Sequence, residues 1–310
     1  MTPRLADRMP VPGAASIARL ARGTALAAFG LIVLGAIVRA TGSGLACPDW
    51  PLCHGRVIPP LQTQVLLEWG HRFVALLVSL GTLALAVRVL ARTALRGALG
   101  GLVAAALVLL AMQIVLGALT VWKLLQFGVV TWHLGNALLF LAALIAIAER
   151  AARLADGDPG ESSADWGPRI GLMAATLATL LQVLLGGLVS TQHAGLACPD
   201  FPGCHGVLAP PLEGLVGLQM IHRYGAWLLT VLLVGVAFGA RRAQDPRVRA
   251  AAAILPALVL LQIVLGVFNV LLAIPVWITA AHLATGTLLY ALLVVATLRA
   301  FAPLPAGEAP

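Results

Sequence analysis

Long apolar stretches separated by short polar connections run through most of the chain. A helix needs about 20 consecutive apolar residues to cross a bilayer core of about 30 Å. Eight stretches meet this requirement, at 19–39, 65–90, 98–121, 127–148, 169–190, 216–240, 250–273 and 276–299. We therefore expect an all-α polytopic membrane protein with eight transmembrane helices. The first stretch is too long, and is followed by too much protein, to be a cleaved signal peptide.

The polar positions between these stretches repeat. The sequence Gly-Leu-Ala-Cys-Pro-Asp at 44–49 recurs letter for letter at 195–200, and the Cys-His-Gly, Pro-Pro and His-Arg that follow recur at the same offset of 151 residues. Further on, Gln-Ile-Val-Leu-Gly at 113–117 returns at 262–266. A duplication that keeps its histidines and cysteines indicates two related units. Four spans per unit is an even number, so we expect two four-helix bundles of one orientation, related by a pseudo-two-fold axis along the membrane normal.

The repeat also predicts how the chain is divided. The connection between the halves is polar and rich in turn-forming residues. We expect an N-terminal arm at 1–18, a first half at 19–148, a linker at 149–168, a second half at 169–300 and a tail at 301–310.

Composition and charge agree with a membrane protein and predict its orientation. Hydrophobic residues make up 60% of the chain and charged residues 10%, and the net charge is +8. Most of the basic residues lie in the connections on one side, which the positive-inside rule makes the cytoplasmic side. We therefore expect cytoplasmic termini, two long outer loops at 40–64 and 191–215, and a bacterial plasma (inner) membrane location. The charge follows topology, so no nucleic-acid partner is expected.

The cysteines lie in the two outer loops. They form two closely spaced pairs, Cys47 with Cys53 and Cys198 with Cys204. In an oxidising compartment this spacing favours one local disulfide in each loop. Covalent haem attachment is excluded, because Trp50 and Phe201 stand where a Cys-x-x-Cys-His motif needs its first cysteine. A zinc site using His54 or His205, and a reversible thiol pair that takes part in electron transfer or cofactor delivery, remain alternatives.

Four histidines lie within the even-numbered spans, His71, His133, His222 and His282. Each is about six residues from the outer end of its span, so all should lie at one level, roughly 9 Å deep. Ionisable residues inside spans are costly and are usually functional. Two imidazoles facing each other across a helical bundle can bind a haem iron on both sides. We therefore pair His71 with His133 and His222 with His282; histidines that only hydrogen-bond a neighbouring helix are the alternative.

The two halves differ chemically beside one histidine of each pair. Glu68 stands one helical turn before His71, whereas Gln219 takes that position before His222. A carboxylate beside one site and an amide beside the other suggest one reacting haem and one spectator.

Arg72 and Arg223 directly follow these histidines. Three roles remain open for them. Each arginine could contact a haem propionate, pair with Asp49 or Asp200 of the loops, or snorkel to the interface.

This combination of motifs resembles the haem A synthase family over about residues 20–300. The resemblance implies an enzyme that oxidises the C8 methyl group of haem O to a formyl group, giving haem A. It implies haem O as substrate between His71 and His133, Glu68 as the catalytic carboxylate, and haem b as an electron-transfer cofactor between His222 and His282. Haem O synthase and terminal-oxidase assembly factors are further partners expected from the order of the pathway.

Two other classes of protein would also use four such histidines. One is a dihaem b-type cytochrome that passes electrons from quinol, which would leave the Glu68/Gln219 difference unexplained. The other is a haem carrier or assembly factor without turnover.

Overall fold

The computed structural model describes residues 10–157, 161–162, 166–243, 245–301 and 303–304. Within them the chain forms eight long helices: α1 (Ala14–Ala40), α2 (Thr63–Leu90), α3 (Thr93–Trp122), α4 (Phe127–Asp156), α5 (Trp166–Thr191), α6 (Gly214–Ala240), α7 (Pro246–Leu271) and α8 (Val276–Ala300). Two short 3₁₀ helices, η2 (Ser43–Leu45) and η3 (Ala194–Leu196), follow α1 and α5, and the two-residue strands β1 (Glu161–Ser162) and β2 (Pro303–Leu304) pair antiparallel. All eight long helices are long and apolar enough to cross a membrane, which confirms the predicted fold class.

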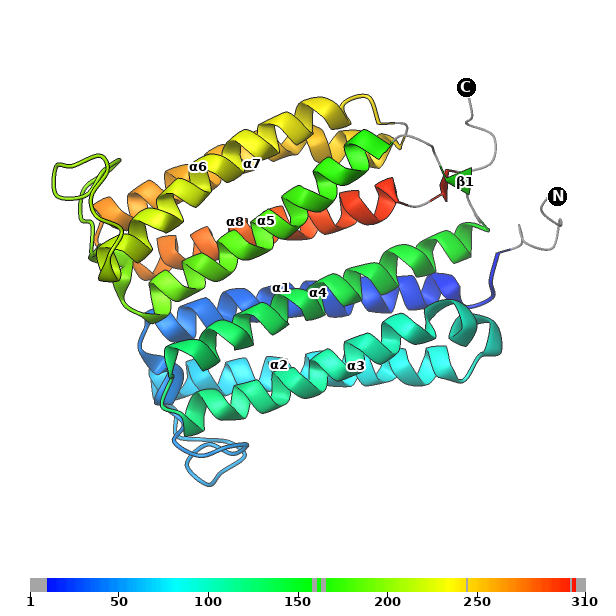
Figure 1. Cartoon of the computed structure of the whole chain (residues 1–310). Helices are drawn as coiled ribbons and strands as arrows, with labels where there is room; N and C mark the ends of the chain where they lie inside the picture. The colour runs from blue at the N-terminus through cyan, green and yellow to red at the C-terminus, as the bar shows by residue number, and fades with distance from the viewer. Residues whose placement is uncertain (1–9, 158–160, 163–165, 244, 302, 305–310) are drawn as a thin grey trace.

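The helices lie in two groups of four, side by side (Figure 1). Helices α1, α4, α5 and α8 occupy the middle, and α2, α3, α6 and α7 flank them. Contacts between the groups join α1 to α8, α4 to α5, and α4 to α8. When α1 is exchanged with α5 and α4 with α8, the same three contacts result. This symmetry fits the predicted pseudo-two-fold relation.

Several helices continue beyond the apolar stretches that predicted them. Helix α3 begins at Thr93 and includes Arg96, and α4 runs on through Arg150 to Asp156. Hydropathy reports only the part of a helix that lies in lipid, whereas backbone hydrogen bonding can extend the helix into water. The connection between α4 and α5 is therefore shorter than the predicted linker at 149–168, and the predicted division of the chain stays a prediction.

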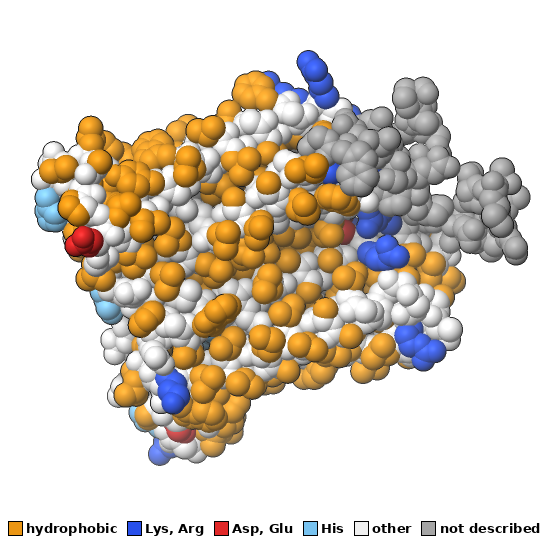
Figure 2. Space-filling view, viewed as in Figure 1, with side chains coloured by type: hydrophobic (Ala, Val, Ile, Leu, Met, Phe, Trp, Pro, Cys, Tyr) orange, Lys and Arg blue, Asp and Glu red, His pale blue; other side chains and the backbone are white. Residues whose placement is uncertain are grey.

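The surface has a broad apolar band with charged residues toward its two ends (Figure 2). Large side chains such as Leu228 and Val231 are 74% and 73% exposed within this band. Arginines gather at the end where α4 passes to α5, while the cysteine-containing loops form the opposite end. An apolar belt of this kind is stable only against lipid, so the chain is a multi-pass membrane protein.

Candidate functional site

Residues of both halves enclose one cavity of about 1440 Å³ toward the end of the bundle that carries the cysteine loops. Its lining includes His71, His133, His222 and His282, together with Glu68 and Gln219. Pockets for a single small molecule are usually roughly 300–1,000 Å³. The cavity therefore has room for more than one large, flat ligand.

The four histidines occupy corresponding places in the two halves. His133 and His282 lie in the second turn of α4 and α8, whereas His71 and His222 lie in the third turn of α2 and α6. All four rings line the same cavity, His71 and His133 from the first half and His222 and His282 from the second. The structure thus places the four predicted histidines around one cavity, and their pairing on a haem iron stays a prediction.

Each imidazole ring packs against a glycine of the preceding helix. A Cβ atom at these glycines would lie 3.0–3.4 Å from the nearest ring atom: Gly35 faces His71, Gly117 faces His133, Gly186 faces His222 and Gly266 faces His282. Because any side chain there would press on a ring, glycine sets how deeply each imidazole can lie between its helices. Two of these glycines, Gly35 and Gly186, were not predicted, although the offset of 151 aligns them.

The histidines of α4 and α8 have equivalent surroundings. The amide nitrogen of Gln113 lies 3.4 Å from Nε2 of His133, and that of Gln262 lies 3.3 Å from Nε2 of His282. In both rings the buried Nδ1 has no hydrogen-bond partner among the described residues. A buried polar atom without a partner is costly, and a bound iron is one way to satisfy such a ring.

The histidines of α2 and α6 have different surroundings. The side-chain amide nitrogen of Gln182, on α5, lies 3.0 Å from Nδ1 of His222 and donates to the His222 carbonyl at 2.8 Å. The ring of His71 makes no hydrogen bond within the described part of the chain. Sequence reasoning missed Gln182, and the repeat does not indicate it, because the equivalent residue of the first half is Leu31.

Glu68 is buried beside the cavity with a counter-charge. It is 7% exposed, and Nε of Arg72 donates to its Oε1 at 3.0 Å. In the second half Gln219 instead donates to the carbonyl of Gly195 at 3.2 Å, and Nε of Arg223 has no partner in the described residues. The chemical difference predicted between the halves therefore extends to the arginine that follows.

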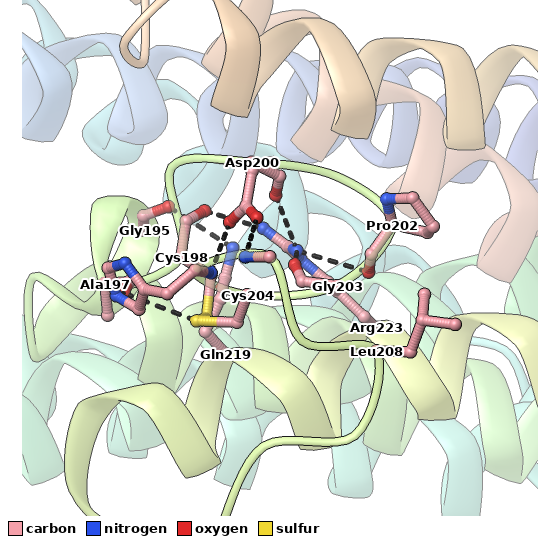
Figure 3. Close-up of a disulfide and its surroundings, with 12 residues drawn as sticks. Gly195, Ala197, Cys198, Asp200, Pro202, Gly203, Cys204, Leu208, Gln219 and Arg223 are labelled. Atoms are coloured by element: carbon pink, nitrogen blue, oxygen red, sulfur yellow. Dashed lines mark hydrogen bonds between the residues drawn. A yellow bond between two sulfur atoms is a disulfide. The ribbon is translucent and has the colours of Figure 1, made fainter.

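The two arginines also connect the outer loops to the helices. The terminal nitrogens of Arg223 donate to backbone carbonyls of the second loop (Figure 3): those of Cys198, Asp200 and Gly203. Arg72 does the same in the first loop, with the carbonyls of Cys47, Asp49 and Leu52. Neither arginine forms an ion pair with a loop aspartate in the described residues, so each holds its loop through the backbone. A propionate contact stays a prediction.

Each outer loop is closed by the predicted disulfide. Cys47 is bonded to Cys53, and Cys198 to Cys204, with 4.7 Å between the Cα atoms in both. The paired cysteines are buried although the loops around them are largely exposed. The expectation of one local link per loop is confirmed.

The repeated Cys-His-Gly forms a tight turn. His54 and Gly55 both have left-handed backbone angles, φ 55° and 69°, and Cys53 pairs with Arg56 across them. Two successive positive φ values define a two-residue hairpin turn, which favours glycine at its second position. The ring of His54 donates to the carbonyl of Ala46 at 2.9 Å, and the described residues contain no cluster suited to a metal ion. The structure therefore favours a turn over the zinc alternative.

An aspartate completes each turn. The carboxylate of Asp49 accepts from the backbone N–H groups of His54 at 2.6 Å and Gly55 at 2.8 Å. The N–H of Gly55, more than any other group, holds the pKa of the Asp49 carboxyl below its ordinary value. Asp200 has the same arrangement, and the N–H of Gly206 lowers its pKa.

One polar contact crosses between the halves at equivalent positions. Arg39, at the end of α1, donates from Nε to the hydroxyl of Ser190 on α5 at 3.0 Å and also to the Ser190 carbonyl. The two residues are 151 apart, which is the offset of the repeat. A residue that contacts the counterpart of its own position lies near the axis relating the halves, and both Arg39 and Ser190 line the shared cavity.

Fold and site together define a class: a membrane protein of two fused four-helix units with two pairs of histidines in a common cavity. The COX15-CtaA family, described as "Cytochrome oxidase assembly protein", matches residues 18–294. The chain belongs to this family.

Curated relatives cover most of the chain. It is 33% identical to the heme A synthase of Symbiobacterium thermophilum, over 68% of this chain and 71% of the relative. It is 30% identical to the heme A synthase of Methylobacterium sp. (strain 4-46), over 83% and 84%. With the heme A synthase of Geobacillus kaustophilus it shares 28% identity, over 86% of both chains.

Proposed function

We propose that this chain is a haem A synthase that oxidises the C8 methyl group of haem O to a formyl group. The observation that carries the proposal is the cavity, in which two equivalent pairs of histidines are accompanied by a carboxylate in one half only. Family membership and the names of the curated relatives support the same activity. In this account the first half binds the substrate and the second half binds the cofactor, haem b.

The histidine surroundings fit haem. His222 and His282 would hold haem b, and His71 and His133 would hold haem O. The facing glycines keep the helices close without filling the space between the rings. Haem b, when bound, supplies one-electron transfer, which no amino-acid side chain offers here.

Glu68 would act on the methyl carbon as it loses electrons. Oxidation leaves that carbon electron-poor, and a carboxylate beside it can stabilise the positive charge or orient a water molecule toward it. The ion pair between Nε of Arg72 and Oε1 of Glu68, 3.0 Å apart, would fix the orientation of the carboxylate. Two successive two-electron oxidations, each adding the oxygen of one water molecule and releasing two protons and two electrons to an external electron acceptor, would convert the methyl group through an alcohol to a gem-diol, which loses water to give the aldehyde.

Haem extraction from the purified full chain, made in cells that supply haem O, tests the proposal. A haem A synthase should yield haem A or hydroxylated haem O together with haem B. Haem B alone in two sites would instead indicate a dihaem cytochrome. Substoichiometric, exchangeable haem would indicate a carrier.

Histidine variants test which half binds the cofactor. His222→Ala and His282→Ala should each remove haem B from the purified protein, because each deletes one of the two residues proposed to hold it. A full low-spin haem b spectrum in both variants would overturn this assignment.

A further inference from the structure

The helices that precede the histidines differ between the halves at one polar position. Gln182 on α5 contacts Nδ1 of His222 at 3.0 Å. The residue 151 positions earlier is Leu31, which also lines the cavity but has no group that can hydrogen-bond an imidazole. The glutamines beside His133 and His282, by contrast, are the same in both halves. The difference is therefore confined to the histidines of α2 and α6.

A second difference accompanies the first. Gly225 lies on α6, one turn after His222, and a Cβ atom there would be only 2.4 Å from Oε1 of Gln182. The corresponding residue of the first half is Val74. Glycine at 225 thus leaves the space that the Gln182 amide occupies, whereas the first half has leucine in place of the glutamine and valine in place of the glycine.

The position of the amide has a defined consequence for the ring. With Nδ1 held by Gln182, Nε2 is the nitrogen left for a metal. An amide can serve either form of the ring, because its NH₂ group donates to a bare Nδ1 and its oxygen accepts from a protonated one. Metal-bound histidines almost always have such a partner on the second nitrogen, and it orients the ring and strengthens the ligand.

We propose that Gln182 is a positioning residue that holds the His222 imidazole for a resident haem. The absence of this partner from the first half leaves His71 a weaker, reorientable ligand, suited to a haem that must be exchanged. The inference rests on the proposed function and deepens it, because a substrate site must release its product while a cofactor site must retain its haem. The difference between the two sites then depends on four residues: Leu31 and Val74 in the first half, and Gln182 and Gly225 in the second.

The test compares haem b retention in the full chain and its variants. Gln182→Leu copies the first half and should release haem b to excess apomyoglobin roughly 10- to 100-fold faster than the original chain. Its haem b midpoint potential should rise, because a less basic imidazole stabilises ferric iron less. Gly225→Ala should act in the same direction although residue 182 is not substituted, because the added methyl group would displace the Gln182 amide.

Two further variants separate positioning from packing. Gln182→Glu restores an acceptor for Nδ1–H, so it should retain haem b and lower its midpoint potential. Val74→Ala, at the equivalent position of the first half, should leave both readouts unchanged. If Gln182→Leu does not fold, Gly225→Ala carries the test alone.

The outcomes distinguish the inference from the function on which it rests. Unchanged release and potential in Gln182→Leu and Gly225→Ala would overturn the role of Gln182 and leave the haem b site standing. An original chain that binds no added haem B in its second half would overturn the proposed function, and the inference with it.

Discussion

The space beside each histidine depends on the absence of a single carbon atom. Where Gly186 faces His222, a Cβ atom would lie 3.0 Å from Cε1 and 3.6 Å from Nε2. Closely packed interiors accommodate an extra methyl group only by shifting side chains or backbone, at a cost of roughly 1–3 kcal/mol. Here the group that would move is the proposed iron ligand, so the effect should appear in haem binding.

We therefore expect Gly186→Ala to lower the haem b content of the purified protein. Gly235→Ala is the matched control in the same half, because nothing lies within 4 Å of a Cβ atom there. Haem B per polypeptide, measured after extraction, should fall only in Gly186→Ala. Equal haem content in the two variants would show that the close approach to His222 is unimportant.

Sequence could predict the histidines but not the residues that position them. Histidine is rare in membrane helices, so four at corresponding places are conspicuous, whereas glycine is common there and Gly35 or Gly186 carries no signal alone. Gln182 was missed for a related reason, because its contact with His222 depends on how α5 packs against α6. The partners of Arg72 are mainly backbone carbonyls, which no pattern of side chains reveals.

Among the elements, the outer loops are the most completely specified by local sequence. A disulfide closes each loop, a left-handed His-Gly turn reverses it, and an arginine of the next helix binds its carbonyls. Leu125 and Ile274, in the equivalent turns after α3 and α7, pack against Gly44 and Gly195 of these loops. Each loop is thereby fixed over the end of its own four-helix unit.

The Asp49 turn should depend on pH. The pKa of Asp49 is lowered in the folded loop, so its stabilising effect is present above the unfolded value of about 3.9 and is lost as the pH falls through the lower folded pKa. Hydrogen exchange of His54 and Gly55, corrected for intrinsic rates, should rise in that acid range. Asp49→Asn should remove the pH dependence.

Asp200→Asn serves as the control for this prediction. It should change the second loop and leave exchange at His54 and Gly55 as it was. Identical pH profiles for the original chain and Asp49→Asn would contradict the assignment of these hydrogen bonds.

Helix positions were predicted better than helix ends. The length of an apolar stretch is set by bilayer thickness, so eight spans could be recognised. Their ends depend on local capping instead. Helix α7 begins where the side chain of Asp245 accepts from the N–H of Arg247, and α4 ends at Asp156, before the left-handed Gly157 with φ 69°. Neither the Asp245 cap nor the left-handed glycine can be recognised from a hydropathy profile.

At the scale of the whole molecule, duplication has produced one cavity with two chemically different ends. The helices that line it are equivalent, and the Arg39–Ser190 contact joins the halves at its lining. Because the two halves share one architecture, different side chains at equivalent positions can give each half its own proposed role, substrate binding in the first and cofactor binding in the second. The positions that differ lie on α1 and α2 in the first half and on α5 and α6 in the second, and they are Glu68/Gln219, Leu31/Gln182 and Val74/Gly225.

We also predict the orientation of the molecule in the membrane. The basic end should face the cytoplasm, because translocating clustered positive charge is disfavoured. A fluorescent protein fused after residue 310 should therefore fluoresce, and alkaline phosphatase inserted in the loop at 40–64 should be active. The opposite pair of results would invert the topology.

The most direct test of the account exchanges the acid and the amide between the halves. Glu68→Gln should fold, retain haem b and bind haem O, yet make almost no haem A, because loss of a preorganised charge near a developing cation costs roughly 100- to 1,000-fold in rate. Gln219→Glu should leave haem A formation largely intact and perturb only haem b. The measurement is haem A formed per enzyme in cells that supply haem O. Near-normal conversion by Glu68→Gln would contradict the assignment of the first half as the reacting one.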